Sequence, residues 1–221
     1  MYREIIKKFN YAGYEAYLVG GSVRDMIMGR QIYDYDICTS ALPKEVYGVF
    51  PDDKIFETGI KHGTVTVIIA SASLEITTYR IESTYSDNRH PDSVEFTDLI
   101  ENDLSRRDFT VNAIAYSPHS GITDPFGGCG DIEKKIIRCV GEPDKRFGED
   151  ALRILRALRF SSVLGFEIEP ETAESIHRNY KLLENISVER IFAELSKLLC
   201  GKDAGRIPRC KGWRQTPYRT Q

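Results

Sequence analysis

The feature that most constrains this chain is the stretch LVGGSVRDMIMGRQIYDYDICT, residues 18–39. Gly20 and Gly21 end an apolar, strand-like run and open a helix-like segment that Gly29 closes. Glycines at such a point let the backbone approach a ligand closely, and the free N–H groups of a starting helix attract phosphate. The pattern therefore predicts a strand, a phosphate-binding turn and a helix, in that order.

The second half of the same stretch carries two aspartates, Asp34 and Asp36, leading into Ile37. Residues i and i+2 of a strand point to the same side, so both carboxylates are expected to face one point. Two facing carboxylates repel each other unless they share a hard divalent cation. Either half of the stretch alone is more often a plain turn or a solvated strand end. Together, with Arg24 placed to meet a phosphate, they indicate phosphoryl transfer on a nucleotide.

Composition sets the class of protein. The 221 residues are 41% hydrophobic and 29% charged, which is typical of a globular protein with one large domain or two small ones. No apolar run approaches membrane-spanning length, and the chain opens directly into a helical pattern without a secretory signal. The five cysteines are scattered and form no C-x-x-C pair, which argues against a zinc site or a disulfide framework. We therefore expect a cytoplasmic protein with no membrane partner.

Hydrophobic periodicity predicts an α+β fold, a mixed β-sheet followed by helices. Strands are expected over residues 16–19, 63–70, 73–80, 122–128 (running into a turn) and 136–140. Helices are expected over residues 2–10, 43–50, 147–164, 170–184 and 188–200, with a short one beginning at 131–133. Residues 80–104 are expected to form a long polar loop, and no strand pattern follows residue 147.

Five segments stand in a fixed order: GGSVRD, DYDI, RRDFTVNAIAY, DPFGGCGDI and EDALRILRALRF. With them the chain resembles the class II tRNA nucleotidyltransferase and bacterial poly(A) polymerase family, within the superfamily that includes DNA polymerase beta. The likeness covers about residues 15–200 and continues through SVERIFAELSKLL.

The resemblance implies a nucleotidyltransferase head over residues 1–142 and an all-helical neck over 143–204 that recognises the base. The family's C-terminal body and tail parts are expected to be missing, which puts tRNA binding and full turnover in question. Residues 205–221 match nothing expected of the family and have no helical periodicity, so a reading as disordered chain stays open. The last sixteen residues carry five Lys or Arg and no acid, although the formal net charge of the chain is −3.

The resemblance also implies roles for residues of the head. Asp34 and Asp36 would ligate Mg²⁺ ions that hold the triphosphate and activate the RNA 3′-hydroxyl. Gly21 and Arg24 would then meet the triphosphate. A third carboxylate, Glu75 on the strand 73–80, either faces the metals or is solvated.

Arg107 and Asp108 are candidates for holding phosphate and ribose, since an aspartate can accept a hydrogen bond from a 2′-hydroxyl. From the residues alone, a helix-capping aspartate beside a solvated arginine is an equally good explanation.

In the neck, Asp150, Arg153, Arg156 and Arg159 fall three apart on one predicted helix. An anonymous helix with this pattern would have a solvated basic face. The resemblance instead makes Asp150 and Arg153 the base-reading pair, with Arg156 and Arg159 neutralising the triphosphate or supporting the pair. Glu149 is expected to orient Arg153.

The expected function is template-independent transfer of CMP and AMP from CTP and ATP to the tRNA 3′ end, with release of pyrophosphate. Alternatives within the family are a specialist that adds only A or only CC, and a poly(A) polymerase. The alternative of another class is a truncated nucleotide- or RNA-binding remnant without productive catalysis. The sequence leaves the oligomeric state open.

Overall fold

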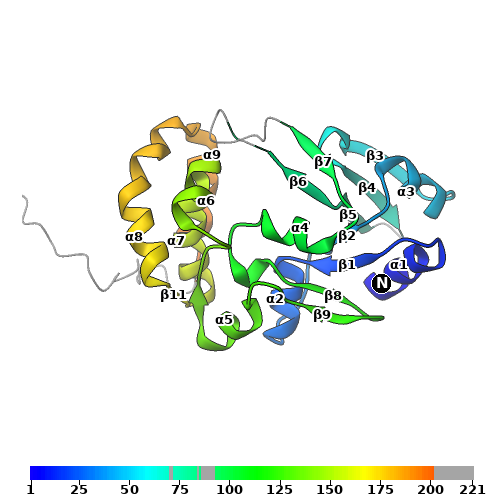
Figure 1. Cartoon of the computed structure of the whole chain (residues 1–221), viewed down its shortest axis with the longest axis horizontal. Helices are drawn as coiled ribbons and strands as arrows, with labels where there is room; N and C mark the ends of the chain where they lie inside the picture. The colour runs from blue at the N-terminus through cyan, green and yellow to red at the C-terminus, as the bar shows by residue number, and fades with distance from the viewer. Residues whose placement is uncertain (70–71, 84, 86–92, 202–221) are drawn as a thin grey trace, which may run out of the picture.

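A seven-stranded mixed sheet occupies the N-terminal part of the chain, and a group of helices follows it (Figure 1). The computed structural model describes residues 1–69, 72–83, 85 and 93–201. This arrangement confirms the predicted α+β class.

The strand order of the sheet is β3-β4-β5-β2-β1-β8-β9. Only β2 and β5 run parallel, and every other neighbouring pair is antiparallel. The predicted hairpin over 63–80 is therefore present as β4 and β5. The strands are β1 (Ala16–Val19), β2 (Asp36–Thr39), β3 (Lys54–Gly59), β4 (Thr64–Ile69), β5 (Ala72–Thr78), β8 (Ala115–Ser117) and β9 (Gly121–Thr123).

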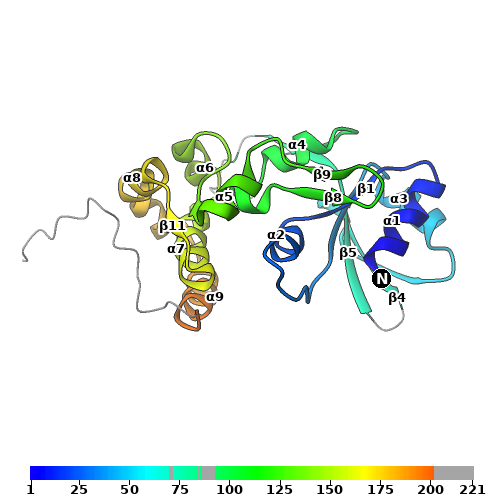
Figure 2. The same cartoon turned by 90° about the horizontal axis from the view of Figure 1, so that it is seen from below.

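Both faces of this sheet are covered, because successive side chains of a strand point to opposite sides. Leu18 of β1 packs in one core with residues of α1 (Tyr2–Tyr11), α2 (Gly21–Ile27) and α3 (Pro43–Val49). Its neighbours Tyr17 and Val19 pack in a second core with α4 (Ile100–Ser105). Figure 2 shows α2 and α4 on opposite sides of the sheet.

The C-terminal part begins with α5 (Gly128–Lys134) and the short β10 (Ile136–Ile137). Within it, α7 packs along α9 and α6 along α8. Its other elements are α6 (Pro143–Glu149), α7 (Leu152–Leu164), β11 (Glu167–Ile168), α8 (Pro170–Asn179), the 3₁₀ helix η3 (Tyr180–Asn185) and α9 (Val188–Leu199).

Two expectations for this part are wrong. The single helix predicted over 147–164 is two helices, because the backbone at Asp150 is extended, with φ −140° and ψ 104°. A strand does follow residue 147, since β11 pairs in parallel with β10. Strands of two residues are too short to produce a detectable alternation. The strand predicted over 136–140 is also shorter than expected, since it consists of β10 and a single bridge between Phe109 and Cys139.

Other differences lie in the head. The strand β3 was not predicted, and the polar loop expected over 80–104 contains regular structure. Strands β6 (Arg80–Glu82) and β7 (Val94–Phe96) pair antiparallel, and α4 begins at Ile100. Of the residues between these strands, 84 and 86–92 lie outside the described part of the chain. The tail over 205–221 lies outside it as well.

Candidate active site

The turn between β1 and α2 requires a glycine at position 20 for two reasons. Gly20 has φ 67°, a backbone conformation that residues with a Cβ rarely adopt. A Cβ there would also lie 2.9 Å from Nη1 of Arg107 and 3.8 Å from Oδ2 of Asp36. At Gly21 the nearest atom, Nη2 of Arg24, would be 3.4 Å away. The close approach of other groups to the backbone that the sequence predicts is therefore found mainly at Gly20 and less at Gly21.

The two aspartates lie beside this turn, but not on one strand as predicted. β2 begins at Asp36, and Asp34 lies in the bend before it. Ser22 of α2 ties the segment to the turn: its hydroxyl donates to the Asp34 carbonyl at 2.6 Å and accepts from the Asp36 amide at 3.4 Å. Loss of hydration raises the pKa of the Asp36 carboxyl. The positive charge of Arg107 lowers this pKa, and the negative charge of Asp34 raises it further, so the net shift is upward. The two carboxylates therefore repel each other in the absence of a cation.

The parallel pairing of β2 with β5 makes Glu75 the register partner of Asp36, and both residues are exposed. Within the described ranges, no three His, Cys, Asp or Glu side chains gather closely enough to hold a metal ion. Mg²⁺ is commonly bound by one or two carboxylates together with substrate phosphates. The pair Asp34 and Asp36 fits that donor set.

Arg24 is buried, and its guanidinium lies between Gly21 of the turn and the helices. Its Nη1 donates to Oδ1 of Asn112 at 2.7 Å, and its Nε donates to Asp25 at 3.0 Å. The guanidinium carbon also lies 5.4 Å from the centre of the Phe160 ring on α7. Arg24 therefore connects the nucleotide turn to the helical part.

Asp108 is 7% exposed and also joins the two parts. Its Oδ2 accepts from Nε and Nη2 of Arg156 at 2.7 and 2.6 Å, while Oδ1 accepts from the Phe109 amide and from Asn112. Burial alone would raise the pKa of Asp108, but Arg156 and then Arg153 outweigh it, so the net shift is downward. Its neighbour Arg107 is not a solvated arginine, since only 17% of its side chain is exposed.

Replacing Asp108 with asparagine is expected to lower the free energy of unfolding by about 3 kcal/mol at pH 7, because it breaks a buried ion pair. A lowered pKa means that this stabilisation is complete above the ordinary aspartate pKa of about 4 and is lost below it, as pH falls through the folded-state value. Denaturant unfolding of both proteins from pH 7 down to 3 measures the difference. If the difference in unfolding free energy between the two proteins stays constant with pH, the Asp108–Arg156 ion pair is not its cause. Asp52→Asn on the exposed surface serves as control.

The proposed base-reading residues are each fixed by a separate partner. Asp150 accepts from the Leu152 amide at 3.1 Å and from Nη2 of Arg190 on α9 at 3.2 Å. Arg153 donates to Glu149 at 2.8 Å, the contact expected from the sequence, and to the backbone carbonyl of Arg106 at 3.1 Å. The break between α6 and α7 places Asp150 before the helix that carries Arg153.

Three arginines surround the ring of Phe160, with guanidinium carbons 5.4 Å (Arg24), 5.3 Å (Arg156) and 4.0 Å (Arg159) from its centre. Arg159 also donates to Glu194 of α9 at 2.6 Å. The alternative of a solvated basic face on this helix is therefore wrong, because its arginines are paired with acids and packed around Phe160.

A family described as "Poly A polymerase head domain" matches residues 16–138, and a second, "Probable RNA and SrmB-binding site of polymerase A", matches residues 165–208. The chain belongs to the class II tRNA nucleotidyltransferase and bacterial poly(A) polymerase family. Nucleotidyltransferases of the DNA polymerase beta type generally use divalent metal ions, in agreement with the paired carboxylates.

Relatives of this family member are known in sequence and in structure. It is 54% identical to a CCA-adding enzyme of Geobacillus thermodenitrificans over 197 residues, 89% of this chain and 48% of the relative. The Bacillus stearothermophilus CCA-adding enzyme in complex with CTP superimposes with a TM-score of 0.85 at 48% identity, covering 93% of this chain and 49% of that one. The Thermotoga maritima CCA-adding enzyme complexed with tRNA gives 0.77 at 28% identity, covering 93% and 48%. The chain spans about half the length of the curated relatives it matches.

Sequence reasoning missed several residues that organise the site of this nucleotidyltransferase family member. Asn112, Phe160, Arg190 and Glu194 all contact predicted site residues. All four stand inside motifs already singled out, RRDFTVNAIAY, EDALRILRALRF and SVERIFAELSKLL, but nothing in a local pattern says which arginine meets which acid.

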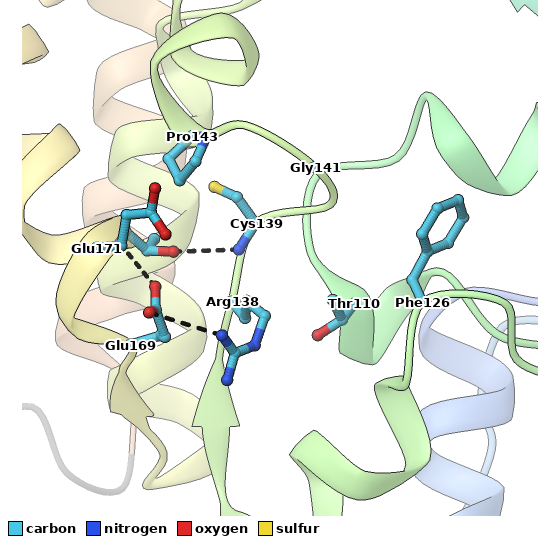
Figure 3. A pocket seen from close by; sticks show the side chains of 9 residues that line it. Thr110, Phe126, Arg138, Cys139, Gly141, Pro143, Glu169 and Glu171 are labelled. Atoms are coloured by element: carbon cyan, nitrogen blue, oxygen red, sulfur yellow. Dashed lines mark hydrogen bonds and ion pairs between the residues drawn. The ribbon is translucent and has the colours of Figure 1, made fainter.

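A pocket at the junction of the two parts is separate from this site (Figure 3). None of the predicted site residues lines it. Its cation, Arg138, pairs with Asp131 at 3.1 Å and with Glu169 at 3.6 Å. Its charge is therefore satisfied from within the protein. In the part of the chain described, no helix has the length and apolar character needed to cross a membrane.

Proposed function

We propose that this chain is the nucleotide-transferring part of a CCA-adding enzyme. It would transfer CMP and AMP from CTP and ATP to the 3′ end of tRNA and release pyrophosphate. The observation that carries the proposal is the placement of Asp34, Asp36 and the Arg107 guanidinium against the Gly20 turn. The similarity to CCA-adding enzymes supports the choice of substrate.

In this proposal Asp34 and Asp36 hold Mg²⁺. When bound, the metal neutralises the triphosphate and makes the RNA 3′-hydroxyl a better nucleophile. The chain's own residues then position the nucleotide. The backbone at Gly21 and the guanidinium of Arg107 hold phosphates. Arg24, whose guanidinium lies beside Gly21, is proposed to meet the triphosphate as well, and its contacts with Asn112 and Phe160 hold it in place.

Asp108 is proposed to accept a hydrogen bond from the ribose. Its Oδ2 is occupied by Arg156, and Oδ1 faces the Phe109 amide and Asn112. Arg156 and Arg159 would supply positive charge near the triphosphate and brace the base-reading residues.

Base choice is proposed to reside in Asp150 and Arg153, since a carboxylate offers only acceptors and a guanidinium only donors. Arg190 holds the first and Glu149 the second, so neither side chain must be ordered when the nucleotide binds. This preorganisation favours selection without a nucleic-acid template.

The proposed division is a head over residues 1–142 and a neck over 143–204, with 205–221 as a separate basic tail. We also propose a cytoplasmic location, which fits the free state of Cys38, Cys129, Cys139 and Cys200.

The deciding experiment is Mg²⁺-dependent incorporation of labelled CTP and ATP into tRNA that ends at the discriminator base, followed by sequencing of the product. Addition of C, C and A supports the proposal. Addition of A alone to a tRNA ending in CC indicates an A-adding specialist, and a long A tract indicates a poly(A) polymerase. Nucleotide binding without incorporation would show that this chain is a binding remnant.

A further inference from the structure

We propose that Asp103 is a positioning residue for nucleotide binding, because it holds the Arg107 guanidinium at the Gly20 turn, where the triphosphate of the nucleotide would lie. This inference rests on the proposed function, since it assumes that the turn receives a nucleoside triphosphate. No local pattern in the sequence marks Asp103 as a site residue.

Asp103 lies on α4 and is completely buried. Its two oxygens serve two different arginines. Oδ2 accepts from Nη2 of Arg107 at 3.1 Å, and Oδ1 accepts from Nη2 and Nε of Arg106 at 2.8 and 3.0 Å. The buried carboxylate therefore holds two neighbouring arginines, one on each of its oxygens.

The two arginines differ in how fully their charge is neutralised. Arg106 has a second acid, Glu82, whose Oε1 accepts from Nη1 at 3.0 Å. Among the described residues, Arg107 has one ion-pair partner, Asp103, which it shares with Arg106, and one weak acceptor, the Cys38 sulfur at 3.3 Å. Its remaining electrostatic partner is Asp36. Positive charge is thus left over on Arg107, the arginine next to the proposed metal ligand.

The remaining donors of Arg107 indicate which kind of ligand its positive charge would bind. Nη1 lies 2.9 Å from the position of a Cβ on Gly20, so the guanidinium touches the bare backbone of the turn. Its Nε is buried and makes no hydrogen bond within the described residues. A buried guanidinium with unused donors beside a side-chain-free turn suits a phosphate group, which accepts several charge-assisted hydrogen bonds.

Asp103 also determines where Arg107 lies. The flexible arginine side chain would otherwise have many conformations, and the ion pair with a fully buried acid selects one. Loss of this acid would leave Arg107 charged but free to turn toward Asp36. The nucleotide would then have to order it on binding, at a cost in affinity.

The test compares Asp103→Asn with Asp131→Asn in the whole chain, by calorimetric titration with CTP and with CMP in the presence of Mg²⁺. Asp131 is a matched control, since it is also buried and paired with an arginine, Arg138, away from the site. We expect Asp103→Asn to weaken CTP binding about tenfold, the loss of about one hydrogen bond to a charged group, and CMP binding less than about twofold. Asp131→Asn should change neither.

A double-mutant cycle with Arg107→Ala separates positioning from general destabilisation. If Asp103 acts through Arg107, the double variant should bind CTP as weakly as Arg107→Ala alone, within about twofold. Additive losses, equal weakening of CTP and CMP, or an unchanged CTP affinity in Asp103→Asn would each overturn the positioning role, while CTP binding by the unchanged chain would leave the proposed function standing. Failure of the unchanged chain to bind CTP would overturn both.

Discussion

Replacing Asp36 or Asp34 with alanine is expected to reduce nucleotide incorporation by at least about a thousandfold while leaving the protein folded. In the proposed function each carboxylate supplies a ligand to Mg²⁺, and the charge stabilisation that a metal provides in phosphoryl transfer amounts to several kcal/mol, about 4 kcal/mol for a thousandfold change. Asp36 stands at the start of β2 and Asp34 just before it, so both changes leave the sheet pairing intact.

Thermal stability should hold or rise in these variants. The pKa of Asp36 is raised in the folded protein, so its ionisation at neutral pH opposes folding, and this penalty is absent below the ordinary aspartate pKa of about 4. Thermal unfolding at pH 7 and labelled CTP incorporation are measured on the same preparations, with Asp52→Ala as control. Near wild-type turnover by either variant would show that these carboxylates do not hold the catalytic metal.

Replacing Arg153 with alanine is expected to weaken selection against UTP and GTP about tenfold to a hundredfold for each hydrogen bond lost. Cytosine presents acceptors at O2 and N3 beside an amino donor, and adenine presents an N1 acceptor beside an amino donor, so one donor–acceptor pair serves both. Uracil and guanine offer a donor where Arg153 also donates. Buried groups left unpaired in this way cost on the order of 1–3 kcal/mol each.

Incorporation of all four nucleotides by the variant measures this selectivity. The structure adds a requirement, because removing Arg153 also leaves Glu149 without that buried partner, so the fold must be checked by thermal unfolding. Arg138→Ala is the control, since Arg138 lies at the separate pocket of Figure 3 and should leave selectivity unchanged. Unchanged discrimination in Arg153→Ala would place base reading elsewhere and leave the neck arginines as phosphate-binding groups.

Local sequence patterns were sufficient to predict much of the fold. The helix α1 with its buried Ile5, Ile6 and Phe9, the hairpin of β4 and β5, and the turn at Gly20 all follow from periodicities of a few residues. Such signals depend on backbone dihedral angles and on which face a side chain takes, and both are properties of neighbouring residues. The strand β11 was not predicted, because two residues are too few to show an alternation.

The family, the α+β class and the residue types of the site follow from sequence alone: a glycine turn, paired aspartates and a run of arginines. The pairing of the charges depends on how the chain packs in three dimensions. Asp108 meets Arg156 across 48 positions, Asp150 meets Arg190 across 40, and Arg159 meets Glu194 across 35. A charge has no preferred partner in the chain, since the Coulomb interaction depends on distance and burial, and only the packing of the elements against one another sets both.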